Sequence, residues 1–435
     1  MPIGSRLTTL LVVLALVALP AVALRAFCVG KSCDSGEATA SAAVPFCPLP
    51  AELRGLISAG FRQGRSPDVM AATAAMGPGV RVSDGAVAVP WPSTGPIDTR
   101  VPIAFFGTGF TGRDPANGTG LDQIAPTLAA AMGYDRSHDE VRAGVPADGV
   151  ADAADEPSLV VQVVWKGVGS ADLESHPHAW PFLRAVIAKG GGTLEGTTGS
   201  LPLDPTATLT TIGTGGLPAQ HGITGMIIRG DDGDVAQAWG PGAPGSVIAT
   251  LADDLDRDTD QHAMIAGVLS SRSDRGIIGD GWYVDRRDRD TVVVTRHPVP
   301  AVAGLLDQVG PEGGVIGVVV RGDVDAMDRT TRQIVRAVRA QVPSSAFVVT
   351  STGSLRGARG EDAAAIAQRV DTSLGSPAIA ATAADGLFLD RTVATQASIT
   401  AAGVSDAMGA ERTPAGAPLF AGTFPSFAVA FARYC

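Results

Sequence analysis

The sequence has few basic residues, few charges overall and only four cysteines. Its 435 residues include 33 basic and 44 acidic side chains, and only three of the basic ones are Lys, so the net charge is −11. This balance argues against nucleic acid or an anionic membrane surface as the main partner. With 45% hydrophobic and 18% charged residues, the chain is too apolar for a disordered protein and long enough for one large domain or two medium ones.

The common hydrolase and nucleotide motifs are also missing. No G-x-S-x-G elbow, H-E-x-x-H helix, P-loop or internal repeat is present. The stretch 107–112 matches G-x-G-x-x-G, but Pro115 follows where a dinucleotide-binding helix should begin, so a glycine turn is favoured. His176 and His178 flank a proline and have no third ligand nearby, which favours a surface loop over a metal pair.

The N-terminus has the pattern of an export signal. Arg6 precedes an apolar run, Leu7 to Leu19, and Ala21-Val22-Ala23 follows. Residues 1–23 are therefore interpreted as a cleaved signal peptide or a retained membrane anchor, because the run is also long enough to span a bilayer. No second apolar run of that length follows. We expect an extracytoplasmic chain, secreted or anchored, that meets the membrane only through this segment.

The cysteines predict disulfides. Cys28, Cys33 and Cys47 lie in or at the end of a polar tether, residues 24–47, and Cys435 is the last residue. An even number of cysteines in an exported chain implies a structural framework. Four cysteines allow three pairings, of which we prefer Cys28–Cys33 with Cys47–Cys435. No spacing matches C-x-x-C or a metal site.

The hydrophobic pattern predicts an α/β fold with a mostly parallel sheet sandwiched by helices. Apolar strands that alternate with helices indicate a parallel sheet that is covered on both faces. The expected strands are 101–106, 159–165, 206–212, 263–269, 292–295, 315–320 and 346–350. The expected helices are 51–61, 121–132, 181–189, 247–255, 325–342 and 361–374.

Four strings resemble the alkaline phosphatase superfamily, in its type I phosphodiesterase/nucleotide pyrophosphatase and phosphoglycerate mutase-like branch. Residues 159–167 (LVVQVVWKG) and 210–223 (TTIGTGGLPAQHGI) are similar to that family's N-terminal half. Residues 98–107 and 121–133, which include D-x-I-A-P-T-L, are similar to its C-terminal signature. The resemblance implies a single alkaline phosphatase-like domain over residues 48–435.

The order of these strings suggests a circular permutation. Residues 48–144 resemble the family's C-terminal part, and residues 158–375 resemble its N-terminal and middle parts. The acidic, proline-bounded linker 145–157 lies where the family's own termini would be. Permutation is tolerated because the termini of a compact domain often lie close together, and Cys47–Cys435 would tie the new ends.

The resemblance also implies that metal-ligand positions are lost. The family holds two metal ions, usually zinc, and attacks phosphate with a Ser or Thr. Lys166 occupies the position of the family's first metal-binding Asp, and Arg100 that of the metal-binding His near its C-terminal end. Thr352 lies where the family has an adjacent Asp and His that bind metal. The nucleophile position falls on Asp204-Pro205, with Thr206 and Thr208 slightly displaced. His221 lies in the conserved-looking H-G-I string and is the type of lone histidine that usually forms structural hydrogen bonds.

These positions leave several functions open. We expect a catalytically inactive envelope protein, without metal, that binds an anionic ligand or a protein partner. In one version Lys166 and Arg100 converge on the anion, with Asp204 as counter-ion; in another, Lys166 and Asp204 form a structural ion pair. The alternative is an active hydrolase of phosphodiesters, phosphomonoesters or sulfate esters with two zinc or manganese ions. A third hypothesis is a metal-free transferase with Asp204 as the nucleophile.

Overall fold

The computed structural model describes the chain in separate stretches, all of which belong to one unit, Ala42–Cys435. They are residues 51–62, 64–66, 69–73, 81–82, 99–134, 143–201, 203–230, 235–280, 282–283, 290–354, 379–381, 386–389, 410–411 and 418–422. The N-terminal segment 1–23, the four cysteines and the expected helix 361–374 lie outside the described residues.

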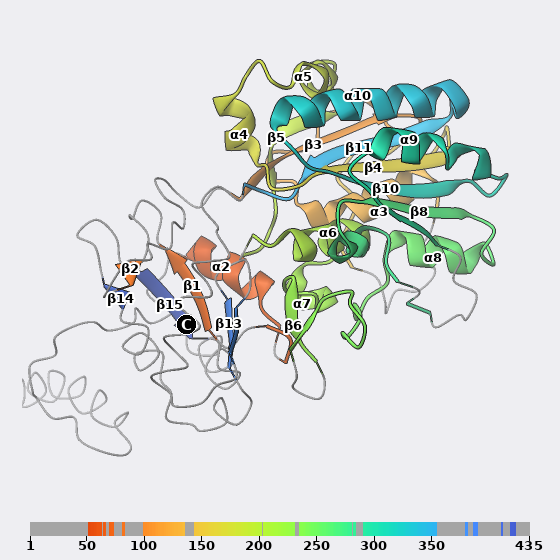
Figure 1. Ribbon diagram of the computed structural model, residues 1–435. Helices are drawn as coiled ribbons and strands as arrows, with labels where there is room; N and C mark the ends of the chain where they lie inside the picture. Colours follow the sequence, from red (N-terminus) through yellow and green to blue (C-terminus); the bar gives the residue numbers. More distant parts are fainter. Residues whose placement is uncertain are drawn as a thin grey trace, which may run out of the picture. The chain divides into compact units, whose positions relative to one another are not determined.

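A seven-stranded sheet is the centre of the fold (Figure 1), in the order β5-β3-β11-β4-β10-β8-β9. β11, β4, β10, β8 and β9 run parallel, which confirms the predicted mostly parallel α/β sheet. The strands are β3 (Arg100–Gly107), β4 (Leu159–Trp165), β5 (Gly192–Thr197), β8 (Met264–Leu269), β9 (Thr291–Val294), β10 (Gly314–Val320) and β11 (Ser345–Ser351).

β3 runs against both of its neighbours, β11 and β5. Because it is reversed, its first residue, Arg100, lies at the edge where the parallel strands end. Ile103 is in register with Thr350 near the end of β11. β5 was not expected from the sequence; its Gly-Thr-Leu-Glu-Gly-Thr run has no continuous apolar stretch.

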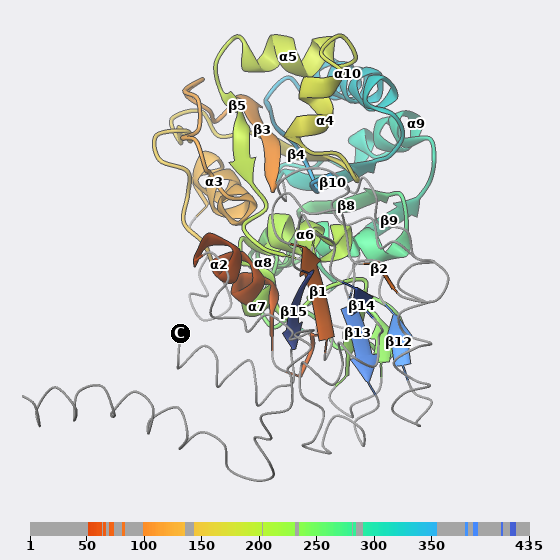
Figure 2. The ribbon, with the colours of Figure 1, turned by 90° about the vertical axis from the view of Figure 1, so that its left-hand side faces the viewer.

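Helices cover both faces of the sheet (Figure 2), as the sequence predicts. One hydrophobic cluster joins even-numbered β4 residues such as Val160 and Val164 to α3, α6 and α8, and a second joins Val161 and Val163 to α4, α5, α9 and α10. The helices are α2 (Ala51–Gly60), α3 (Ile124–Ala131), α4 (Ser170–Ser175), α5 (Pro181–Ile187), α6 (Pro205–Thr214), α7 (Pro218–His221), α8 (Leu251–Asp258), α9 (Pro298–Ala303) and α10 (Val324–Gln341).

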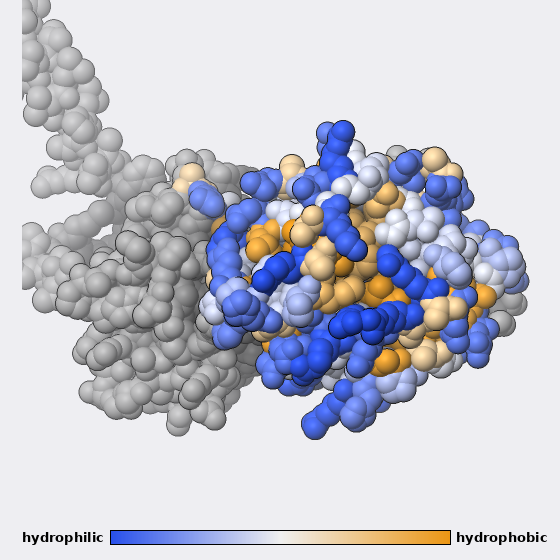
Figure 3. All heavy atoms as spheres, turned by 90° about the horizontal axis from the view of Figure 1, so that it is seen from above, coloured by the Kyte–Doolittle hydropathy of each residue, from blue (hydrophilic) through white to orange (hydrophobic). Residues whose placement is uncertain are grey.

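The long helix α10 packs on the face of the sheet that carries Val161 and Val163. Its buried residues recur at helical spacing, as in Ile334, Val335 and Val338. Seen from above, this side of the molecule carries rows of hydrophilic side chains with hydrophobic atoms between them (Figure 3). Three short 3-10 turns complete the described secondary structure around the large sheet, namely η1 (Leu121–Gln123), η3 (Arg272–Ile277) and η4 (Leu306–Gln308).

The strand expected at 206–212 is wrong, because these residues form helix α6. Asp204 caps the helix, Pro205 occupies its first position and Gly215 ends it with φ 81°. Along the helix, the hydroxyls of Thr210 and Thr214 donate to carbonyl oxygens four residues earlier, at 2.9 and 2.7 Å. These end signals and local bonds outweigh the β-preference of the threonine-rich run.

Other boundaries shift by a few residues. The helix expected at 247–255 begins at Leu251, because Thr250 and Asp253 form a capping box there. The helix expected at 121–132 is divided into η1 and α3. The linker 145–157 has neither helix nor strand, apart from an isolated bridge between Ala151 and Phe110.

Smaller antiparallel sheets bring distant parts of the sequence together. The order β12-β13-β1-β15 pairs Val69–Thr73 with Pro418–Gly422 in full register, and Val82 pairs with Ala410. Their strands are β1 (Val69–Thr73), β2 (Arg81–Val82), β6 (Ile227–Arg229), β7 (Val235–Gln237), β12 (Ile379–Ala381), β13 (Gly386–Leu389), β14 (Ala410–Glu411) and β15 (Pro418–Gly422). Among the described helices, none has the length and apolar character needed to cross a bilayer.

Candidate functional site

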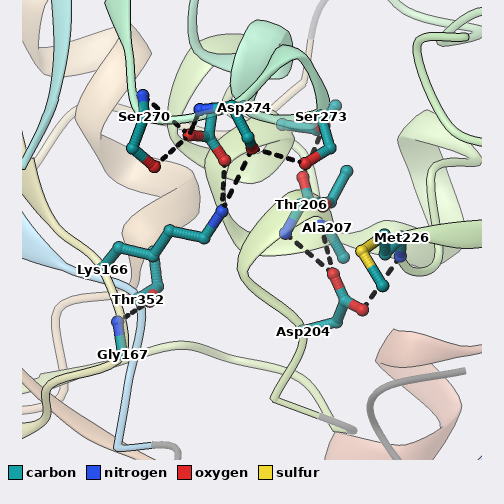
Figure 4. Close-up of polar contacts among 12 residues, drawn as sticks. Lys166, Gly167, Asp204, Thr206, Ala207, Met226, Ser270, Ser273, Asp274 and Thr352 are labelled. Atoms are coloured by element: carbon teal, nitrogen blue, oxygen red, sulfur yellow. Dashed lines mark hydrogen bonds and ion pairs between the residues drawn. The ribbon is translucent and has the colours of Figure 1, made fainter. Parts of the chain in front are cut away.

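Several of the predicted site residues meet at the carboxyl edge of the parallel strands, where open α/β sheets bind ligands. Lys166 directly follows β4 and Thr352 directly follows β11. Asp204 and Thr206 lie at the start of α6, next to the turn η3 that follows β8 (Figure 4). The sequence argument placed Lys166 at this edge with Asp204 beside it, but it expected Thr206 to begin a strand, whereas Thr206 lies in the first turn of a helix.

The central contact of this edge is an ion pair between Lys166 and Asp274. Lys166 Nζ lies 2.5 Å from Asp274 Oδ1 and 3.5 Å from Ser271 Oγ. The Asp274 side chain is fully buried and that of Lys166 is 21% exposed. The expected ion pair of Lys166 with Asp204 is thus wrong in its partner, since Lys166 is bonded to an aspartate that the sequence argument did not single out.

Asp274 is held rigidly from its other side. Oδ2 accepts hydrogen bonds from Ser270 N at 3.1 Å, Ser270 Oγ at 2.6 Å and Ser271 N at 2.8 Å. The Ser-x-x-Asp spacing that follows β8 is a capping box. The sequence pattern alone predicts a helical turn at these residues. It does not predict that Asp274 forms an ion pair with Lys166.

Asp204 is the N-cap of α6. Its Oδ1 accepts from the amides of Thr206 at 2.8 Å and Ala207 at 3.3 Å, and its Oδ2 accepts from Met226 N at 2.9 Å (Figure 4). Burial raises the pKa of Asp204 above its usual value, while these three amides and the nearby charge of Lys166 act in the opposite direction. Asp204 therefore caps α6 with one oxygen and fixes the chain just before β6 with the other.

The threonines of this edge are buried. Thr352 Oγ1 accepts from Gly167 N at 2.8 Å and its own amide donates to Trp165 O at 3.0 Å, so it fastens the end of β4 to the end of β11. Thr206 and Thr208 are 2% and 5% exposed. The Thr206 hydroxyl has no hydrogen bond to any residue in the described part of the chain, although its amide is bonded to Asp204.

Arg100 lies on the same edge but is bonded to carboxylates. Its guanidinium donates to Glu174 of α4 at 2.9 and 3.1 Å and to Glu195 of β5 at 3.1 Å. All three side chains are more than a third exposed. This differs from the expected role of Arg100 as an anion ligand beside Lys166, because its positive charge is matched by two negative ones.

His221 is a structural hydrogen bonder within the buried junction of α6 and α7. Ile223 N donates to Nδ1 at 3.0 Å, which leaves the proton on Nε2 for Thr211 Oγ1 at 3.1 Å. The ring is completely buried, and this burial, with the nearby Arg62 charge, lowers the pKa of His221 to about 3. The imidazole is therefore neutral at physiological pH and both of its nitrogens are used.

The remaining motifs form turns. Gly107, Gly109 and Gly112 all have positive φ and are followed by irregular chain, as expected for a glycine turn. His176 lies at the end of α4, where Nδ1 is 3.0 Å from Asp172 O. Within the described residues, no group of three or more His, Cys, Asp or Glu has the arrangement of a metal site.

Comparison with known proteins gives no relative. No family model matches the chain, and neither the curated proteins nor the solved structures contain a match. Any functional assignment must therefore come from the residues themselves.

Proposed function

We propose that this chain is a non-catalytic, exported binding protein built on an alkaline phosphatase-like α/β fold. The observation that carries the proposal is the 2.5 Å pair of Lys166 and Asp274 at the end of β4. In the family that the sequence resembles, a metal-binding Asp would stand at this strand end. An ammonium group there repels a divalent cation instead of holding it.

The surroundings of the pair favour a structural role over anion binding. An anion needs donors that are not already used. At the start of α6, Pro205 has no N–H, and the amides of Thr206, Ala207 and Thr208 all donate to Asp204. The charge of Lys166 is balanced by Asp274. We therefore infer that the edge is stabilised internally and that the chain acts through binding elsewhere on its surface, with a protein or small-molecule partner.

Two features of the fold support the proposed family relationship and permutation. A mostly parallel sheet, with α6 beginning at the edge where Lys166 lies, is the arrangement that the resemblance implies. The pairing of β1 with β15 joins residues 69–73 to 418–422, as expected when the family's internal connection has become the chain ends. Export through residues 1–23 remains a proposal from the sequence.

The test combines metal content with activity. The purified chain is incubated with excess zinc and manganese, desalted and analysed for metal, and is then assayed with p-nitrophenyl phosphate, bis-p-nitrophenyl phosphate and p-nitrophenyl sulfate. We expect no retained metal and no turnover above background. About two metal ions per chain, or turnover that Lys166→Ala abolishes, would overturn the proposal.

One observation favours the hydrolase as a second candidate. Thr206 lies in the first turn of α6, beside the position at which the family's nucleophile is expected, and its hydroxyl makes no hydrogen bond within the described residues. If the assays show hydrolysis, Thr206→Ala should remove it while Thr210→Ala, a change on the same helix, should not. If both variants keep their hydrolytic activity, Thr206 is not the nucleophile.

A further inference from the structure

A cavity of about 320 Å³ lies away from the Lys166 edge, between the loop after β7 and the start of α8. The residues that carry its chemistry are Trp239, Pro244, Ser246, Asp253, Asp280 and Trp282. This volume suits a small organic molecule. The walls combine two indole rings with two carboxylates, and none of the described residues that line the cavity is basic.

Trp239 is held in an unfavourable state on one wall. Its φ is 62°, a left-handed value that a bulky residue rarely adopts. Its indole Nε1 is buried and has no hydrogen-bond partner among the described residues, while its ring packs against the small core of Ile223, Ile228 and Ala238. Strain and an unused buried donor in one residue are features that cluster at binding sites.

Trp282 is fixed on another wall. Its Nε1 donates to Ser246 O at 3.0 Å, and its ring meets that of Tyr283 edge-on at 4.9 Å. Its amide also donates to Asp253 Oδ1 at 3.3 Å. These contacts hold the ring in place without a ligand, so binding would not need to order it.

The cavity is negatively charged. Asp253 is 8% exposed, accepts from Thr250 through Oδ2 and lines the cavity. Asp280 is half-exposed and pairs with Arg275 at 2.7 Å; Arg275 also lies 3.9 Å from Asp290. Two carboxylates and no basic side chain thus stand among the described residues that line the cavity, beside two indole rings.

We propose that this cavity binds an organic ammonium ion. The positive group would lie between the indole rings and the carboxylates, because a cation is attracted both to the face of an aromatic ring and to negative charge. The inference concerns a different site from the Lys166 edge and goes beyond the function proposed above.

Choline and its neutral isostere, 3,3-dimethylbutan-1-ol, provide the test. Both have the same shape and hydroxyl group, and only choline has a positive charge. Each is titrated into the full-length chain by calorimetry at matched ionic strength, with glucose as a neutral polyol. We expect saturable choline binding, and binding of the isostere at least about tenfold weaker.

Variants locate the binding. Asp280→Asn removes a half-exposed charge of the cavity, and Trp282→Leu removes a ring; each should weaken choline binding about tenfold. Asp307→Asn, an exposed change outside the cavity, is the control and should leave binding unchanged. Circular dichroism checks that Trp282→Leu is folded, and Asp280→Asn decides the question if it is not.

Each contrary result overturns the proposal. Equal affinity for choline and its isostere would show that charge has no role, and tighter binding of glucose would identify a polyol site. Failure of choline to bind, or choline binding that neither cavity variant weakens, would remove the assignment to this cavity. None of these outcomes depends on Lys166 or on retained metal, so this inference and the proposed function fail separately.

Discussion

The carboxyl edge of the sheet and the tryptophan cavity differ in the side chains that face their open space. At the edge, Asp274 and Asp204 use both carboxylate oxygens and Lys166 has a charged partner. In the cavity, Asp253 also uses both of its oxygens, but two indole rings line the space beside it. The difference teaches where binding capacity remains, because a group satisfied inside the protein must break a bond before it can bind a ligand, whereas the face of an aromatic ring can attract a cation without doing so.

The largest expected effect on stability comes from the protonation of His221, which lies in the buried junction of α6 and α7. Its pKa is lowered to about 3 in the folded chain, whereas the unfolded value is 6.5. The unfolded state therefore binds the proton first, and stability is full above pH 6.5 and is lost as the pH falls towards 3. The loss amounts to about 5 kcal/mol over the whole window.

Urea unfolding of the wild type and His221→Gln between pH 7 and pH 4 measures this effect. The wild type should lose more stability than the variant, while the exposed His178→Gln should follow the wild type. Equal pH slopes in the wild type and His221→Gln would contradict a neutral buried imidazole.

The second prediction compares the stability cost of removing a lysine at the carboxyl edge with that of removing one from the exposed surface. Lys166→Ala leaves the fully buried Asp274 without its counter-ion, and we expect a loss of about 3 to 5 kcal/mol in the free energy of unfolding. Lys189→Ala, an exposed change to one of the other two lysines, should cost almost nothing and serves as the matched control. A similar small cost in both variants would show that the pair does not organise the edge.

The third and smallest effect belongs to the cavity and has the opposite sign to that of His221. Burial raises the pKa of Asp253 from 3.8 to about 6, so the folded state holds the proton more tightly than the unfolded state. Stability should therefore fall as the pH rises from about 4 to 6, by about 3 kcal/mol in total.

The measurement is the stability of the wild type minus that of Asp253→Asn across this pH range, with Asp307→Asn as control. The difference should decline with rising pH and then level off. A difference that increases with pH would mean that Asp253 is stabilised as a charged group, which contradicts a pKa raised by burial.

The sequence was informative where structure is local. β4, β10 and β11 are continuous apolar runs, and their positions were predicted to within one residue. The rule that open parallel sheets bind ligands at their carboxyl edge predicted that Lys166 and Arg100 lie at that edge, and both do. Helix α6 was missed because its threonines favour a strand, and only the cap at Asp204 and Pro205 reverses that preference.

Pairings across long sequence separations were not predictable. Asp274 is 108 residues from Lys166, and nothing in the sequence distinguishes it from the other aspartates as the ion-pair partner. Trp239 and Trp282 are isolated in the sequence, with no periodicity or motif around either of them. Both line one cavity only because the chain segments that follow β7 and η3 lie next to each other in the fold.

The strand order also determines when the sheet can close. β4 pairs with β10 and β11, whose residues come about 150 and 180 positions later in the chain. A nascent chain that ends before residue 314 therefore holds the buried strand β4 without either of its neighbours. Such long-range pairing delays the closure of the sheet, because the intervening chain must be ordered before the strands can meet. Until then the apolar side chains of residues 159–165 stay exposed, and an exposed apolar strand is prone to aggregation.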